Sequence, residues 1–195
     1  IFSKKNTDHI NKHVSDLIQN GYTKIKNEKF KELNNQIFFD KIKNVFHEKN
    51  TVYQNSGAAK ELKQEIYYLE DPTYYLEELS PLYEIKELNQ ICLEYIGDDC
   101  KLQNAELMKV DSTSDSSHGS GLFHHDTIGH RLKVYFNFSI EENSRPTWFA
   151  KKSHINTWPE NHAKVSRFRN DFVEKNFEIV PLSKTQIDEV LIFDT

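Results

Sequence analysis

Residues 131–140 read RLKVYFNFSI, and this stretch decides the fold class. Apolar and polar side chains alternate along it. The apolar set is Leu132, Val134, Phe136 and Phe138, and the polar set is Lys133, Tyr135, Asn137 and Ser139. A period of two is typical of a β-strand with two different faces. We therefore expect a strand that packs its apolar face on other elements and turns Lys133 the other way.

Working outward from this strand, the second half of the chain favours short strands. Residues 102–110, 122–126, 147–150 and 189–193 are the other segments that we expect to be extended. The first hundred residues instead carry apolar stripes at helical spacing. They predict helices over residues 7–20, 30–45 and 80–96, with Ile18 and Ile37 among the core positions. Helices first and short strands second predict an α+β protein whose helices buttress a β-sandwich or barrel.

Composition restricts the class of protein. At 195 residues with 37% hydrophobic and 12% aromatic residues, the chain has the composition of one folded domain. The net charge of −5 argues against a general nucleic-acid binder. Two cysteines without a CxxC pair exclude a disulfide framework and a thiolate zinc site. We find no membrane-length apolar run and no leader at Ile1, and therefore expect a soluble cytoplasmic protein with no membrane partner.

The residues with the clearest chemistry are Phe123-His124-His125-Asp126. In a strand, residues two apart point to the same side, so His124 and Asp126 would face one way together. An imidazole beside a carboxylate forms two thirds of a 2-His-1-carboxylate iron(II) site. The alternative for this triplet alone is ordinary polar surface.

The order of motifs around the triplet resembles the phytanoyl-CoA dioxygenase-like branch of the iron(II)- and 2-oxoglutarate-dependent oxygenases. The aromatic-His-x-Asp of residues 123–126 is followed by the strand of residues 131–140 and then by an acidic turn. Lys152-Ser153-His154 stands where the family has Gly-Ser-His. The apolar segment of residues 190–195 resembles the strand that runs into Phe-Asp before the family's second iron histidine. The resemblance covers roughly residues 102–195.

This resemblance implies a fold, an activity and a site. The fold would be a double-stranded β-helix, a jelly-roll, cupin-like barrel, with helical support from residues 1–100 and a barrel core from residues 101–195 in one domain. The activity would be hydroxylation of a small-molecule substrate with dioxygen, with iron(II) as metal and 2-oxoglutarate as cosubstrate. His124 and Asp126 would be metal ligands. Asp126 also favours hydroxylation over halogenation, because related halogenases carry a small residue at this position.

The third ligand of the family site has no counterpart up to Thr195. In the family, a histidine and then a 2-oxoglutarate-binding arginine follow the Phe-Asp strand, so the chain is either cut short or a degenerate relative. His130, His154 and His162 are weaker alternatives within the chain, and His154 matches a family position that is usually structural.

Two rival functions stay open on the sequence. One is an iron-free jelly-roll binding protein, and the other is a cupin-like isomerase or lyase. Lys133 is the candidate for cosubstrate binding, because an ammonium inside a barrel needs an anion and a 2-oxoglutarate carboxylate is suitable. The alternative is a lysine whose head reaches water. The polar loop of residues 111–121 is either a closing lid or a plain connection.

Overall fold

The computed structural model describes residues 4–49, 52–53, 65–111, 123–124, 131–138, 147–155, 167–182 and 188–195. Its helices are α1 (Lys4–Asn20), α2 (Glu28–Leu33), α3 (Gln36–Lys49), α5 (Ser80–Tyr83), α6 (Lys86–Ile96) and α7 (Asn170–Asn176), and its short 3-10 turns are η1 (Pro72–Tyr74), η2 (Glu77–Leu79) and η4 (Ser153–Ile155). Its strands are β1 (Tyr22–Lys26), β2 (Val52–Tyr53), β3 (Glu65–Glu70), β4 (Glu106–Asp111), β5 (Phe123–His124), β6 (Leu132–Phe136), β7 (Trp148–Ala150), β8 (Arg167–Phe168), β9 (Ile179–Pro181) and β10 (Glu189–Asp194).

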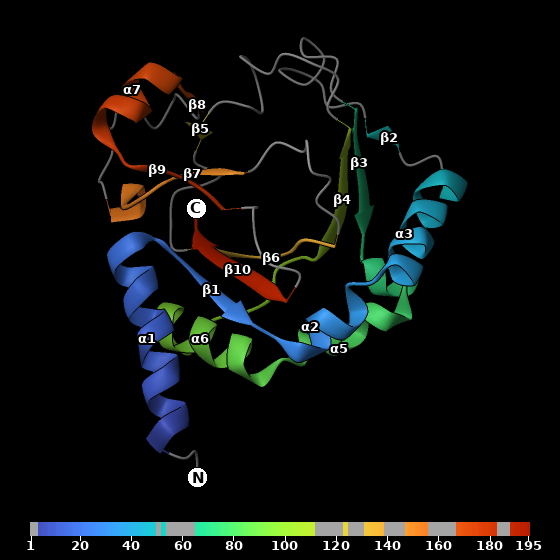
Figure 1. Ribbon diagram of the computed structural model, residues 1–195, viewed down its shortest axis with the longest axis horizontal. Coiled ribbons are helices and arrows are strands. Elements are labelled where there is room, and N and C mark those ends of the chain that lie inside the picture. The colour runs from blue at the N-terminus through green and yellow to red at the C-terminus, as the bar shows by residue number, and fades with distance from the viewer. Residues whose placement is uncertain are drawn as a thin grey trace.

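The described strands form four small antiparallel sheets. Their orders are β1-β10-β6, β2-β3-β4, β5-β8 and β7-β9. The strands surround a common interior, and helices α1, α6, α2 and α5 lie outside sheet β1-β10-β6 (Figure 1). The arrangement is α+β, and the hydrogen bonds among these described strands do not join them into one closed barrel. The jelly-roll topology therefore stays a prediction.

The alternating segment of residues 131–140 contains a strand whose apolar face packs on the helices, as predicted. Residues 132–136 form β6, and the apolar side chains Leu132, Val134, Phe136 and Phe138 pack on the large core under the helices. Phe30 of α2 lies edge-to-face against Phe136 and Phe138, with both ring centroids at 5.3 Å. The prediction that this face packs on the helices is confirmed.

Strand β10 is buried on both faces, which explains its unbroken apolar sequence. Val190 and Ile192 belong to the helix-side core, while Leu191 and Phe193 point the opposite way. The helix-side core consists of Ile10, Leu17, Ile25, Phe30, Phe38, Ile42, Phe46, Leu69, Leu76, Leu79, Leu82, Ile85, Leu88, Ile91, Val190 and Ile192. The inner core consists of Phe149, Leu182, Leu191 and Phe193. The predicted strand at 189–193 is confirmed and extends by one residue to Asp194.

Several helical predictions are corrected. The region of residues 1–100 also contains β1, β2 and β3, so it is not purely helical. The helix predicted over 80–96 is divided into α5 and α6, because Ile85 has an extended backbone with φ −71° and ψ 99°. Ile18 and Ile37 are 57% and 76% exposed, and their predicted core positions were wrong. Among the described helices, each is too short or too polar to cross a membrane.

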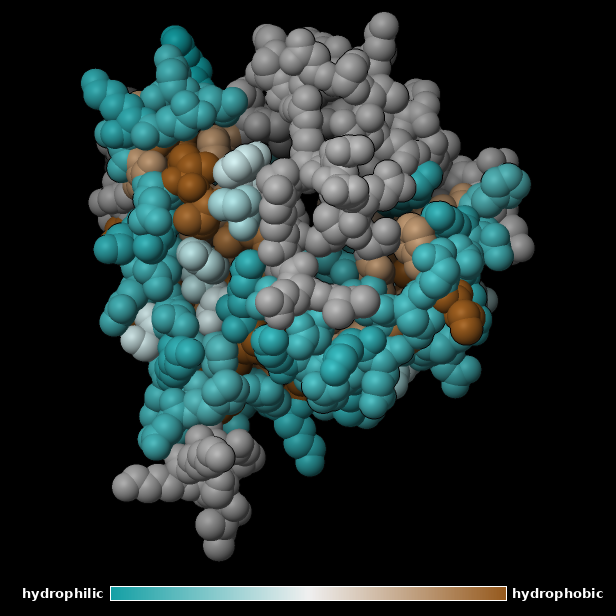
Figure 2. Space-filling view, viewed as in Figure 1, coloured by the Kyte–Doolittle hydropathy of each residue, from teal (hydrophilic) through white to brown (hydrophobic). Residues whose placement is uncertain are grey.

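The distribution of polar and apolar residues on the surface agrees with the positions of these cores. Figure 2 shows a largely hydrophilic surface over the helices, with a hydrophobic area over β7, β9 and the base of α7. Trp148 and Phe172, which come from β7 and α7, are 52% and 42% exposed. The helix layer therefore presents its polar side to solvent and its apolar side to β10 and β6.

Candidate functional site

His124 lies on β5, which pairs antiparallel with β8 so that Phe123 stands opposite Phe168. Phe123 packs on a third core, formed by Ala150, Phe168 and Val173. Because successive side chains on a strand point to opposite faces, His124 points away from this core, and it is exposed. An exposed imidazole on a strand is suitable as a metal ligand.

Asp126 lies outside the described residues, and the predicted pairing of His124 with it is therefore not described. The same holds for four other histidines in this part of the chain, which are His118, His125, His130 and His162. The loop predicted over residues 111–121 is likewise described only at Asp111.

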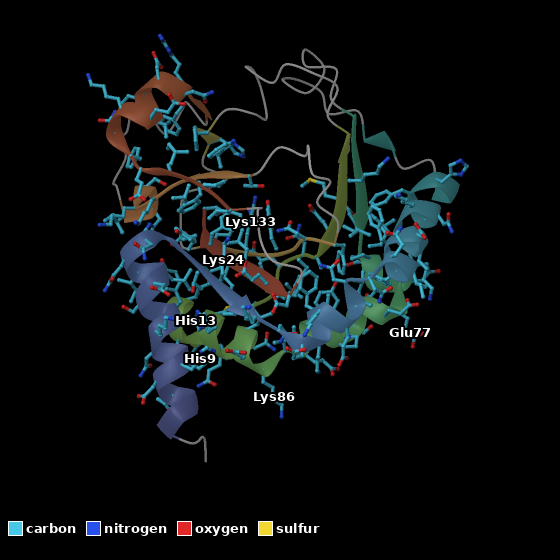
Figure 3. All side chains as sticks on the ribbon, in the orientation of Figure 1. His9, His13, Lys24, Glu77, Lys86 and Lys133 are labelled. Atoms are coloured by element: carbon cyan, nitrogen blue, oxygen red, sulfur yellow. The ribbon has the colours of Figure 1, made fainter. Side chains whose placement is uncertain are left out.

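Lys133 lies on the face of β6 that looks away from the helices. It stands opposite Phe193 of β10 in the antiparallel register, and it is half-buried. Tyr135 shares this face and packs edge-to-face on Phe193, with ring centroids 4.8 Å apart. Lys133 and Tyr135 thus point away from the helix layer, as the alternation predicted. Figure 3 shows Lys133 on the side of β10 where β7 lies.

A second lysine on this face was missed by the sequence analysis. Lys24 of β1 stands opposite Leu191, so it points to the same side of the sheet as Lys133. Its Nζ lies 3.8 Å from Glu189 Oε2, so a carboxylate balances its charge. The alternating sequence YTKIK of β1 is the signal that could have identified it.

Strand β7 connects the strand of His124 to the sheet of Lys133. Phe149 of β7 belongs to the inner core with Phe193, whereas the adjacent Ala150 belongs to the third core with Phe123 at its edge. The ring centroids of Phe149 and Phe193 are 5.9 Å apart. Strand β7 therefore lies between β5, which carries His124, and the sheet that carries Lys133.

The C-terminal end of β10 lies beside the start of β6. Asp194 pairs with Leu132, and the backbone N–H of Thr195 donates to the carbonyl of Arg131 at 3.1 Å. The buried Asp194 carboxylate accepts a hydrogen bond of 2.6 Å from the Tyr95 hydroxyl of α6. Burial, and then this hydrogen bond, raise the pKa of Tyr95 far above its usual value. The contact fastens α6 to the end of the central strand.

His154 lies against the end of α1. Its Nε2 is 3.2 Å from the carbonyl oxygen of Ile18, and its ring packs so closely on Gly21 that a Cβ there would be 2.5 Å from Nδ1. Donation by Nε2–H satisfies one of the carbonyls that a helix leaves unpaired at its C-terminus. This contact joins the η4 turn to the end of α1.

Three other side chains meet in the helix layer. Within the described ranges, one group of His, Cys, Asp or Glu residues has the spacing of a metal site, and it consists of His9, His13 and Glu87. One ligand atom from each residue lies within 4.8 Å of the other two. The group joins α1 to α6 on the helix side of the sheet, whereas Lys133 lies on the other side. The spacing of the two histidines, four apart on a helix, is the signal that the sequence analysis missed.

Comparison of the chain with models of protein families, with curated proteins and with solved structures gives no match.

Proposed function

We propose that the protein is an iron(II)- and 2-oxoglutarate-dependent dioxygenase that hydroxylates a small-molecule substrate. The observation that carries the proposal is the register between β6 and β10. In the family that the sequence resembles, the iron ligands come from the His-x-Asp and from a histidine just after the Phe-Asp strand. Those two segments must therefore meet, and the hydrogen bond between Thr195 and Arg131 joins the end of that strand to a residue that stands five positions after Asp126 in the sequence.

In this proposal, His124 and Asp126 hold the iron, and Lys133 binds a carboxylate of 2-oxoglutarate. Bound iron(II) and 2-oxoglutarate supply the oxidising chemistry when they react with dioxygen. The chain's own part is to orient these groups and to exclude water. The aromatic side chains of Tyr135 and Phe193 beside Lys133 provide an apolar surface for that purpose.

The same reading includes a jelly-roll barrel with helices on its outer side. Two observations support it. The described strands pair only antiparallel, and helices cover one face of the β1-β10-β6 sheet while β7 packs on the other. Polar and apolar faces of β6 divide between these two sides, which is the arrangement that such a barrel needs.

Anaerobic titration of the full-length protein with iron(II) and 2-oxoglutarate tests the proposal. A weak visible charge-transfer band is expected, and it should be absent in His124→Ala and in Asp126→Ala. His47→Ala is the matched control, because His47 is an exposed histidine of α3, and it should keep the band. Lys133→Met should weaken the binding of 2-oxoglutarate more than that of iron.

The outcomes separate the rival functions. Absence of the band in the intact protein would overturn the oxygenase proposal and favour an iron-free binding protein. Iron binding that depends on His124 but is indifferent to 2-oxoglutarate would instead favour a cupin-like isomerase or lyase.

A further inference from the structure

We propose that His9, His13 and Glu87 bind a divalent transition-metal ion of the zinc type, which links α1 to α6. This site is separate from His124 and Asp126, and it does not depend on the proposed oxygenase function. Figure 3 shows His9 and His13 on the side of α1 that looks toward α6. Residues four apart on a helix lie on one face, so the two imidazoles and the Glu87 carboxylate can converge on one point.

The strongest indication is an unsatisfied nitrogen on a buried histidine. His13 is only 4% exposed, and its Nδ1 lies 2.7 Å from the hydroxyl oxygen of Thr23 on β1. The Thr23 hydroxyl also lies 3.5 Å from the Asp16 carboxylate, and when it donates there its oxygen can accept from His13 Nδ1–H. The remaining nitrogen of His13, Nε2, is buried and has no hydrogen-bond partner. Because buried polar atoms are nearly always paired, this nitrogen is the atom that a bound ligand would satisfy.

Glu87 carries a second buried polar atom that has no hydrogen-bond partner. Its Oε1 is buried and has no hydrogen-bond partner, although His9 Nε2 lies only 2.6 Å away as an ion pair. The two atoms are close without the alignment of an N–H···O hydrogen bond. Two imidazole nitrogens and a carboxylate oxygen that converge in this way form a geometry that a shared cation would stabilise.

The surroundings of His13 match those of a metal-binding histidine. Such a histidine usually donates its other ring N–H to an acceptor, which fixes the tautomer and the orientation of the ring. Thr23 fills that role for His13, and Asp16 in turn holds Thr23.

The donor set decides the class of ion. Two nitrogens and one carboxylate oxygen suit Zn²⁺ and its neighbours in the transition series, whereas Mg²⁺ and Ca²⁺ prefer all-oxygen sites. Ligand atoms around tetrahedral zinc are about 3.4 Å apart for bonds of about 2.1 Å. The present limit of 4.8 Å requires a modest rotation of side chains. His9 and Glu87 are 54% and 29% exposed, which allows this movement.

An ion can also reach the site, because the side chain of His9 is 54% exposed. With three protein ligands, the metal would keep a fourth position for water, as three-ligand zinc sites do.

The test is a titration of the full chain with Co²⁺ and then Zn²⁺, in a His124→Ala/Asp126→Ala background that removes the proposed iron site. Co²⁺ should give visible d–d absorption at one equivalent, and Zn²⁺ should displace it and raise the unfolding temperature. His9→Ala and Glu87→Gln should abolish both effects, because each removes a ligand from a partly exposed position. His47→Ala, an exposed histidine of α3, should leave both effects unchanged.

Thr23→Val sharpens the test, because it keeps all three ligands and removes the acceptor that orients His13. Affinity should fall about 10- to 100-fold. No metal-dependent absorption or stabilisation in the background variant would overturn the site, as would binding that persists in Glu87→Gln. Because the iron titration depends on His124 and Asp126, the two proposals can fail independently.

Discussion

The two faces of sheet β1-β10-β6 differ in what covers them. On one face, Val190 and Ile192 join a core to which five helices contribute. On the other face, Leu191 and Phe193 join a small core with Phe149 and Leu182, and lysines share that face. A large apolar core stabilises the fold, whereas a small core beside cationic side chains is suited to hold a polar ligand. The difference indicates that the helix side carries most of the stability, and under the proposed function the inner side would hold the cosubstrate.

Among the substitutions considered, Ile192→Ala is expected to lower the free energy of unfolding most, because it removes a side chain from the helix-side core. Its side chain is fully buried, so truncation leaves a cavity and should cost about 4 kcal/mol of unfolding free energy. Urea denaturation measures this change. Ile37→Ala, at a 76% exposed position of α3, should change stability by less than about 0.5 kcal/mol. Equal effects of the two substitutions would contradict the assignment of the core.

Gly21→Ala tests how the inner side joins α1 to the sheet. Gly21 has φ +83°, and a Cβ would lie 2.5 Å from His154 Nδ1 and 2.9 Å from Phe149 Cζ. The left-handed backbone conformation and the overpacking together should lower the free energy of unfolding by about 3 kcal/mol. In a double-mutant cycle, His154→Ala should relieve part of this cost, because it removes the nearest atoms. Strict additivity would show that the contact with His154 is unimportant.

Tyr95→Phe removes the hydrogen bond between α6 and β10 without changing the shape of the ring. Asp194 is 6% exposed and accepts this bond at 2.6 Å, so its loss should cost about 2 kcal/mol. Tyr74→Phe is the control, because Tyr74 is 84% exposed, and it should have almost no effect. A neutral Tyr95→Phe would mean that the bond does not hold the helix to the strand.

Two of the three strands of sheet β1-β10-β6 could be predicted from the hydrophobicity pattern of their own residues. Alternation identified β6, and an unbroken apolar run identified β10. Strand β1 was missed because its five residues include two lysines, and its partner β10 lies far away in sequence. The boundary between α5 and α6 was missed because the backbone of Ile85 departs from the helix without a glycine or a proline at that position.

For the candidate sites too, the sequence indicates relations between nearby residues but not those that tertiary packing creates. The pairing of His124 with Asp126 could be predicted from the sequence because a spacing of two residues on a strand is a local relation, and it stays a prediction. The group on α1 and α6 was not found, since Glu87 joins His9 and His13 only through the packing of two helices. The buried, unpaired Nε2 of His13 is likewise a property of the folded chain alone. Sequence therefore indicates local pairs of ligands, and tertiary packing decides which distant side chain completes them.

Burial also affects the reactivity of Cys92 in the helix layer. Burial raises the pKa of this thiol from 9.0 to about 11, with a smaller contribution from Cys100. Because the thiolate is the nucleophile and only about 1% of Cys92 is thiolate at pH 9, its reaction should be about 50-fold slower than that of a thiol with the ordinary pKa. Iodoacetamide labelling followed by mass spectrometry should therefore modify Cys92 about 50 times faster in urea-unfolded protein than in folded protein.

The raised pKa of Cys92 also predicts that the folded state becomes less stable at alkaline pH. The folded state holds the thiol proton more tightly, so its contribution is complete below pH 9 and is lost as the pH rises through about 11. Cys92→Ala should reduce this alkaline loss of unfolding free energy, measured by urea denaturation across that range. Labelling of Cys92 at equal rates in folded and unfolded protein would show that α6 does not shield it, and it would weaken the view that the helix layer is the closed side of the sheet.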